Sequence, residues 1–220
     1  MAGQSPNGVG EYHPQNWQKQ LSRKFRWRLT NQIDCLLGTF CKRYPEIDVS
    51  FEVLNHDGVV NRLRSNLDDI YVMSKPPADI DLVDETFMTN PLVVIAATNS
   101  LLAKRKQLVL SELAGERFIL REKGSGTRMA IDHHFKATRF HPNLRLELGS
   151  NEAIKESVAG GLGISVLSSH ALHGQAREHG VGVLNVQGFP IESNWHVVHH
   201  KGKKLSPIAS VFKSYLLASV

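Results

Sequence analysis

Residues 121–128, with the sequence REKGSGTR, decide the fold. The run RFILRE at 117–122 predicts a strand, the GSG that follows predicts a turn, and residues 127–137 have the spacing of a helix. A strand that leads through a glycine turn into a helix is typical of α/β proteins. The junction therefore indicates an α/β fold. It also predicts an anion site at the helix N-terminus, where backbone N–H groups are free.

The side chains of this junction fit such an anion site. Ser125 or Thr127 can cap the helix and offer a hydroxyl, and Arg121 and Lys123 flank the turn. Arg128 lies in the first turn, where the helix dipole disfavours a cation. An anion or a partner carboxylate beside Arg128 would explain it, while a capped helix with solvated arginines fits equally well. The spacing is not that of a P-loop, because no Gly-Lys-Ser/Thr follows.

Two further junctions carry candidate binding residues. In LGSNEAIK at 148–155 a strand again meets a helix, where Ser150 or Asn151 can cap and Glu152 suits the dipole. Capping alone explains this segment, although the side chain of Asn151 would also point into a crevice at the carboxyl ends of the strands. In VAGGLGISVLS at 158–168 the glycines suit a tight helix-to-strand return, and Ser165 can add a hydroxyl to a cleft.

The rest of the chain continues the alternation of strands and helices. Residues 1–23 are polar and predict a disordered tail. Apolar periodicity predicts helices over 33–41, 57–67, 127–137, 151–158 and 206–217, and strands over 25–29, 47–54, 68–74, 82–87, 91–98, 117–122, 144–150, 164–168, 181–186 and 195–200. This order predicts an α/β fold with mostly parallel sheets.

Composition limits the possible functions. The chain has 220 residues, 41% of them hydrophobic and 21% charged, which is ordinary for one large or two small globular domains. Neither an apolar run long enough for a bilayer nor a secretory leader is present, so we expect a cytoplasmic protein without a membrane partner. The net charge of +5 is scattered and is a weak cue for nucleic-acid binding. It fits equally a protein that binds small anions, or a fragment of something larger that touches DNA elsewhere.

Residues outside these junctions form no recognisable catalytic or metal site. Cys35 and Cys41 match no disulfide scaffold or spaced metal motif, and the eleven histidines show no convergent ligand set. No nucleophile stands beside an evident base. We therefore expect neither an enzyme nor a protein with a cofactor or a bound metal.

Seven segments together resemble the effector-binding domain of LysR-type transcriptional regulators in order and spacing. They are FCKRYP (40–45), DDIYVMS (68–74), NPLVVIAA (90–97), REKGSGTR (121–128), GSNEAIK (149–155), AGGLGISVLS (159–168) and FPIESNWHVV (189–198). The resemblance runs from about Leu36 to the C-terminus. The second, fourth and fifth segments are most similar to the carbon-fixation branch of the family, the CbbR- and CmpR-like regulators.

The resemblance implies two Rossmann-like subdomains of the type 2 periplasmic-binding-protein fold, with a ligand cleft between them. Subdomain I would comprise residues 24–97 and 201–220, and subdomain II residues 98–200. Two crossover strands would pass between them near 96–99 and 198–200.

The resemblance also implies a ligand and partners. Effectors in the carbon-fixation branch include ribulose bisphosphate, phosphoglycolate, oxoglutarate and NADPH, and the predicted anion site favours a phosphorylated one. The expected ligand-binding residues are Ser125, Thr127, Arg128, Arg121, Asn151 and Ser165, faced from subdomain I by Met73 and Ser74. A homodimer is implied. DNA would be bound only through a winged helix-turn-helix domain, which this sequence does not contain.

The sequence departs from the family before Leu36. There the family has a first strand and a hydroxyl-rich turn, whereas this chain has FRWRLTNQIDC at 25–35, with Thr30 and Asn31 as polar substitutes. A shifted reading frame and genuine divergence both explain the break, and a degenerate copy of a regulator would explain it as well. Two different classes of protein also use this fold. A solute-binding protein would need an export signal, and an enzyme would need an acid–base group in the cleft, such as Glu152 or a histidine.

Overall fold

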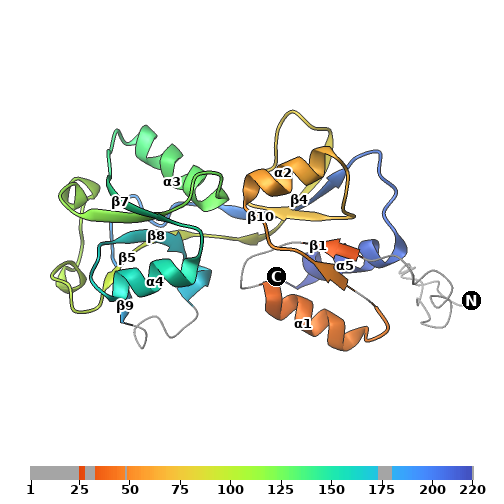
Figure 1. Ribbon diagram of the computed structural model, residues 1–220, viewed down its shortest axis with the longest axis horizontal. Coiled ribbons are helices and arrows are strands. Elements are labelled where there is room, and N and C mark those ends of the chain that lie inside the picture. The colour runs from red at the N-terminus through yellow and green to blue at the C-terminus, as the bar shows by residue number, and fades with distance from the viewer. Residues whose placement is uncertain (1–24, 28–32, 48, 173–179, 220) are drawn as a thin grey trace, which may run out of the picture.

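The chain folds into two α/β subdomains that lie side by side (Figure 1). The computed structural model describes residues 25–27, 33–47, 49–172 and 180–219. The tail expected over 1–23, together with Thr30 and Asn31, lies outside the described residues. Within those described ranges, no helix is long and apolar enough to cross a membrane. The predicted two-subdomain α/β architecture is confirmed.

Subdomain I is built around an antiparallel sheet. Its strands, in sheet order, are β3 (Tyr71–Met73), β10 (Asn194–His200) and β4 (Leu82–Thr89). Its helices are α1 (Ile33–Arg43), α2 (His56–Arg64) and α5 (Pro207–Ala218). A parallel pair, β1 (Phe25–Trp27) and β2 (Val49–Phe51), completes it. A strand thus forms at 25–27, where the sequence departs from the family pattern.

Aromatic packing between α1 and α5 holds subdomain I together. Phe40 and Phe212 are both fully buried, and their rings meet edge to face with centroids 4.8 Å apart. Burying one such side chain contributes roughly 1.5–3 kcal/mol. Helix α1 ends at Arg43, shortly before Pro45, as the sequence predicts.

Subdomain II contains a second antiparallel sheet and a parallel pair of strands. The sheet has the order β8 (Ser165–Ser168), β5 (Leu92–Ala97) and β9 (Val181–Val183), and the pair is β6 (Arg117–Arg121) and β7 (Asn143–Leu148). The subdomain also contains the helices α3 (Gly126–Ala137) and α4 (Asn151–Ala159) and the short 3-10 helices η2 (Leu102–Lys104), η3 (Leu110–Leu113) and η4 (Ser169–Leu172). Phe118, which is fully buried, packs edge to face on Phe135 and Phe140 at the centre.

The chain crosses between the subdomains earlier than expected on both passes. It leaves the sheet of β4 and enters that of β5 at residues 90–91, and it returns at 191–193 before β10. The two passes are tied by Asn90 N–H donating to Ser193 O at 2.7 Å and Leu92 N–H donating to Ile191 O at 2.9 Å. The crossovers expected near 96–99 and 198–200 are therefore wrong. In consequence β5 belongs to subdomain II and β10 to subdomain I. The expected boundaries at 97/98 and 200/201 therefore move to the crossings at residues 90–91 and 191–193.

The expectation of mostly parallel sheets is also wrong for the described residues. Strand β10 runs antiparallel to β3 and β4, and β5 runs antiparallel to β8 and β9. Because β4 leads out of subdomain I and β10 leads back into it, the two crossing strands lie beside each other in opposite directions. Parallel pairing is kept in β1–β2 and in β6–β7, where strand and helix alternate.

Candidate functional site

A cavity lies between the two subdomains, at the ends of β3 and β6. It is lined by Leu54, Asn55, His56, Val59, Val72, Met73, Ser74, Arg121, Ser125, Gly126, Thr127 and Trp195. Subdomain I contributes the end of β3, the start of α2 and Trp195 of β10, while subdomain II contributes the end of β6 and the start of α3. Five of the eight expected site residues, namely Met73, Ser74, Arg121, Ser125 and Thr127, therefore meet in one cavity.

The N-terminus of α3 opens into this cavity. Ser125 occupies the N-cap position and is 3% exposed, yet no capping hydrogen bond from its side chain is formed within the described residues. The hydroxyl is thus available to a ligand rather than committed to the helix. The backbone N–H groups of residues 126–128 belong to the first turn, where intrahelical acceptors are lacking. Together with the helix dipole, these groups can bind an anion.

Glycines allow the α3 turn to contact subdomain I. A Cβ atom on Gly126 would overlap Ser74 Oγ, and one on Gly124, whose φ is +85°, would lie 2.6 Å from Asp57 Oδ2. Asp57 lies in the first turn of α2, so the contacts bridge the cleft at both the β3 and the α2 side. The cleft in this structure is closed, in that the two subdomains are in contact at Gly124 and Gly126.

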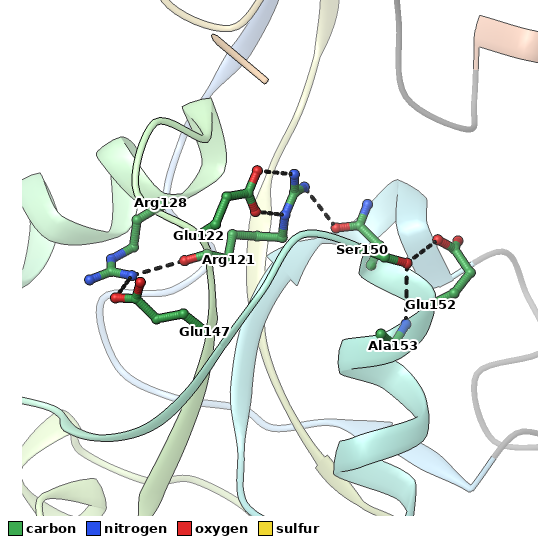
Figure 2. A network of polar contacts seen from close by, with 8 residues as sticks. Arg121, Glu122, Arg128, Glu147, Ser150, Glu152 and Ala153 are labelled. Atoms are coloured by element: carbon green, nitrogen blue, oxygen red, sulfur yellow. Dashed lines mark hydrogen bonds and ion pairs between the residues drawn. The ribbon is translucent and has the colours of Figure 1, made fainter. Parts of the chain in front are cut away.

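Arg121 enters the cavity wall with its guanidinium already hydrogen-bonded (Figure 2). Nε and Nη2 donate to the two carboxylate oxygens of Glu122 at 2.9 and 3.1 Å. Nη1 donates to Asn151 Oδ1 at 3.1 Å. Asn151, the first residue of α4, is not among the lining residues, so it positions Arg121 instead of facing the cavity.

Arg128 does not line the cavity and instead pairs with carboxylates of its own subdomain, among them Glu147 (Figure 2). Its Nε donates to Asp132 at 2.9 Å, and its Nη1 donates to Glu147 Oε1 at 2.8 Å and to Arg121 O at 2.9 Å. Burial acts to lower the pKa of Arg128, but the hydrogen bonds to Glu147 and Asp132 outweigh it and raise this pKa above its ordinary value. The carboxylate partner, one of the two explanations for Arg128, is present. Arg128, one of the expected ligand-binding residues, is not among the residues that line the cavity.

Ser165 does not reach the cavity either. Phe118 of β6 is bridged in parallel to Ile164, which places Ser165 level with Ile119, two positions before Arg121 at the strand end. Ser165 is fully buried, and its hydroxyl has no hydrogen-bond partner among the described residues. The glycine run before it serves the return to β8, because a Cβ on Gly163 would overlap the Arg117 carbonyl oxygen.

The start of α4 is a capped helix, as the simpler explanation of its sequence required. Ser150 accepts a hydrogen bond from Ala153 N–H at 3.3 Å, and Ser150 Oγ donates to Glu152 at 3.1 Å. Glu152 is exposed and is not among the cavity-lining residues, which removes it as the acid–base group of an enzyme. In the described part of the chain, no group of three or more histidine, cysteine or acidic side chains could hold a metal.

Seven of the twelve lining residues are not among the expected site residues, and three of these seven, Asn55, His56 and Trp195, carry a polar or aromatic side chain. Asn55 caps α2 by accepting from Gly58 N–H at 3.0 Å, and His56 Nε2 lies 2.8 Å from Lys75 O. The junction between β2 and α2 thus lines the cavity together with the junction between β6 and α3. The signal was present, since an asparagine before a helical apolar pattern is a preferred N-cap.

Comparisons with known proteins agree with this geometry. The sequence model of the LysR substrate binding domain matches residues 31–220. The HTH-type transcriptional activator CmpR of Synechocystis is 44% identical over 83% of this chain and 60% of its own length. A RuBisCO operon transcriptional regulator of Acidithiobacillus ferrooxidans is 40% identical over 85% of this chain and 60% of its own length. The Synechocystis CcmR regulatory domain, solved in complex with 2-PG (2-phosphoglycolate), has a TM-score of 0.84 at 42% identity and covers 89% of this chain and 96% of its own.

The curated relatives indicate the class of protein to which the chain belongs. This chain spans about 60% of the length of the curated relatives named above. Those relatives are transcriptional regulators, neither transport proteins nor enzymes, which favours a sensing domain over a solute-binding protein or an enzyme.

Proposed function

The chain belongs to the LysR substrate-binding-domain family, and we propose on that premise that it is the effector-sensing domain of a regulator of carbon-fixation or inorganic-carbon-uptake genes. The observation that carries the proposal is the cavity between the subdomains, where the start of α3, Ser125 and Arg121 offer donors to an anion. The intact regulator would act on DNA in the cytoplasm through a separate DNA-binding domain.

A small phosphorylated metabolite fits this cavity best. Its volume is about 60 Å³. On the same measure a single water needs about 10–15 Å³, so the cavity has room for about four to six water-sized groups. That suits phosphoglycolate better than ribulose bisphosphate or NADPH, and the related CcmR domain is known with 2-PG. A phosphate group would accept charge-assisted bonds from Arg121 and hydrogen bonds from Ser125, Thr127 and the α3 backbone.

The mechanism follows from the closed cleft. A ligand that contacts both Ser74 of subdomain I and Ser125 of subdomain II binds the closed arrangement more tightly than an open one. It therefore shifts the population toward closure. In a homodimer joined through this domain, that shift would change how the attached DNA-binding domains are held.

The direct test is calorimetric titration of the chain with 2-phosphoglycolate, ribulose bisphosphate, oxoglutarate, NADPH and inorganic phosphate at matched ionic strength. We expect 2-phosphoglycolate to bind and to raise the melting temperature, since a ligand at a hundred times its Kd stabilises by about 2.7 kcal/mol. Arg121→Ala and Ser125→Ala should weaken binding, whereas Arg105→Ala, on the far loop before η3, should not. A cooperative melt without binding of any of these compounds would contradict the proposal. Absence of a cooperative melt would support the alternative that the chain is a degenerate copy of a regulator.

A further inference from the structure

Glu122 already pairs with Arg121, the lining residue whose positive charge would attract an anionic ligand. Both carboxylate oxygens of Glu122 accept from Arg121, at 2.9 and 3.1 Å, in a bidentate pair. A guanidinium has five N–H donors, of which this pair takes two and Asn151 takes a third. Within the described part of the chain, Arg121 thus reaches the cavity with its charge compensated and with two donors to spare.

The placement of Glu122 is specific to the end of β6. Neighbouring side chains along a strand point to opposite faces, but β6 ends at Arg121, and the chain then turns toward α3. Glu122 can therefore fold back beside Arg121, with a side chain 27% exposed against 11% for Arg121. A carboxylate so close to the cavity repels every anion that enters it.

Glu122 is not the only residue that orients the guanidinium of Arg121. The side-chain oxygen of Asn151 anchors the same guanidinium from α4, and Asn151 is neutral. A site built only to hold Arg121 in place could do so without an acidic residue next to an anion site. The negative charge of Glu122 is the feature that calls for a function.

We propose that Glu122 is a built-in competitor for Arg121 that raises the interaction energy an anion must supply in order to bind in the cavity. Inorganic phosphate and other simple anions gain too little from the two remaining donors of Arg121 to offset the repulsion by the Glu122 carboxylate. A ligand that also contacts Ser125, the α3 backbone and Ser74 offsets this repulsion and binds. The inference rests on the proposed function only in taking the ligand to be an anion.

The test compares Glu122→Gln with the parent chain and with Glu156→Gln, which removes the same charge from an exposed position further along α4. Titrations use glycolate, sulfate, inorganic phosphate and 2-phosphoglycolate. Removing one charge a few ångströms away changes affinity by about tenfold per unit of ligand charge. We expect Glu122→Gln to bind all four anions more tightly, with sulfate gaining more than glycolate. Inorganic phosphate should become a measurable ligand, and added salt should reduce the gain.

The outcomes separate this inference from the proposed function. If Glu122→Gln melts like the parent but binds anions equally or more weakly, Glu122 only orients Arg121 and the inference is overturned. An equal gain in Glu156→Gln overturns it as well. If the parent fails to bind 2-phosphoglycolate, the proposed effector is wrong. The role of Glu122 is still decided in that case, because Glu122→Gln either binds inorganic phosphate more tightly than the parent or does not. Should Glu122→Gln not fold, Glu122→Ala is measured in the same way.

Discussion

Replacing Gly126 with alanine should block closure of the cleft without harming the fold. Gly126 is the first residue of α3, and its φ lies outside the left-handed region, so alanine can adopt its backbone conformation. Alanine in a helix is favoured over glycine by about 0.5–1 kcal/mol. The free energy of unfolding of the unliganded protein should therefore stay the same or rise, while the closed arrangement is penalised.

The size of the penalty follows from the contact across the cleft. The new Cβ would overlap Ser74 Oγ, far inside the 3.4 Å at which ordinary van der Waals contact begins. Ser74 can rotate its hydroxyl, or the subdomains can move apart. Overpacking of this kind costs about 1–3 kcal/mol. If closure accompanies binding, the Kd of the effector rises by about 5- to 150-fold.

Ser74→Ala provides the matched control. It removes the overlapping oxygen and leaves Ser74 Cβ, which lies at an ordinary 3.6 Å from the position of the new Cβ. Ser74→Ala should weaken binding by itself, because Ser74 lines the cavity. In the double variant, however, Gly126→Ala should cost less than it does alone. The coupling free energy from this double-mutant cycle isolates the contact between the subdomains.

Titration calorimetry with 2-phosphoglycolate on the four proteins measures the cycle, and thermal melts without ligand check the fold. Small-angle scattering of unliganded Gly126→Ala should show a larger radius of gyration than the parent. An unchanged Kd in Gly126→Ala, or a cycle without coupling, would refute closure at this contact.

Three further predictions concern residues away from the cleft contact. Arg128→Ala removes the bond to Glu147 and should destabilise the fold by about 2–3 kcal/mol in a denaturant melt, with loss of binding only in proportion to unfolding. Ser165→Ala removes a buried hydroxyl that has no partner among the described residues, and it should leave the Kd unchanged and the melting temperature equal or higher. Burial lowers the pKa of His134, as it does for His199, so the unfolded chain binds protons more readily and stability falls as the pH drops below about 6.5. His134→Gln should make the fall in melting temperature between pH 7 and pH 5 shallower, and an identical fall would contradict this assignment.

The sequence predicted the strand-to-helix junctions well because each is a local event. Apolar periodicity placed β6 and α3, and the glycine and serine residues between them marked the turn. The first crossing of the chain could also be found in sequence, since Asn90-Pro91 is a turn signal directly before β5. Asn55 was missed because it is the N-cap of α2, and the periodicity of apolar residues gives no signal at a polar capping position.

The destinations of the polar side chains were harder to predict. Asp132 lies four residues after Arg128, a spacing that favours an ion pair on a helix and can be found in sequence. Glu147 comes from β7, so its contact with Arg128 exists only after β6 and β7 pair. Ser165 was expected to add a hydroxyl to the cleft, yet the parallel bridge from Phe118 to Ile164 sets its depth in the sheet.

The cavity itself is the least local feature, because no segment of sequence contains both of its walls. Ser74 and Gly126 come together only after β4 and β10 have fixed how the two subdomains face each other. Trp195 illustrates the dependence, since the pairing of β10 with β4 shifts register between Trp195 and His196, and neither strand alone encodes that shift. A sequence pattern can thus name donors on one wall, such as Ser125, but their partners across the cleft follow from the crossing strands. For the same reason, a substitution in β10 that alters this register should change ligand affinity without touching any donor.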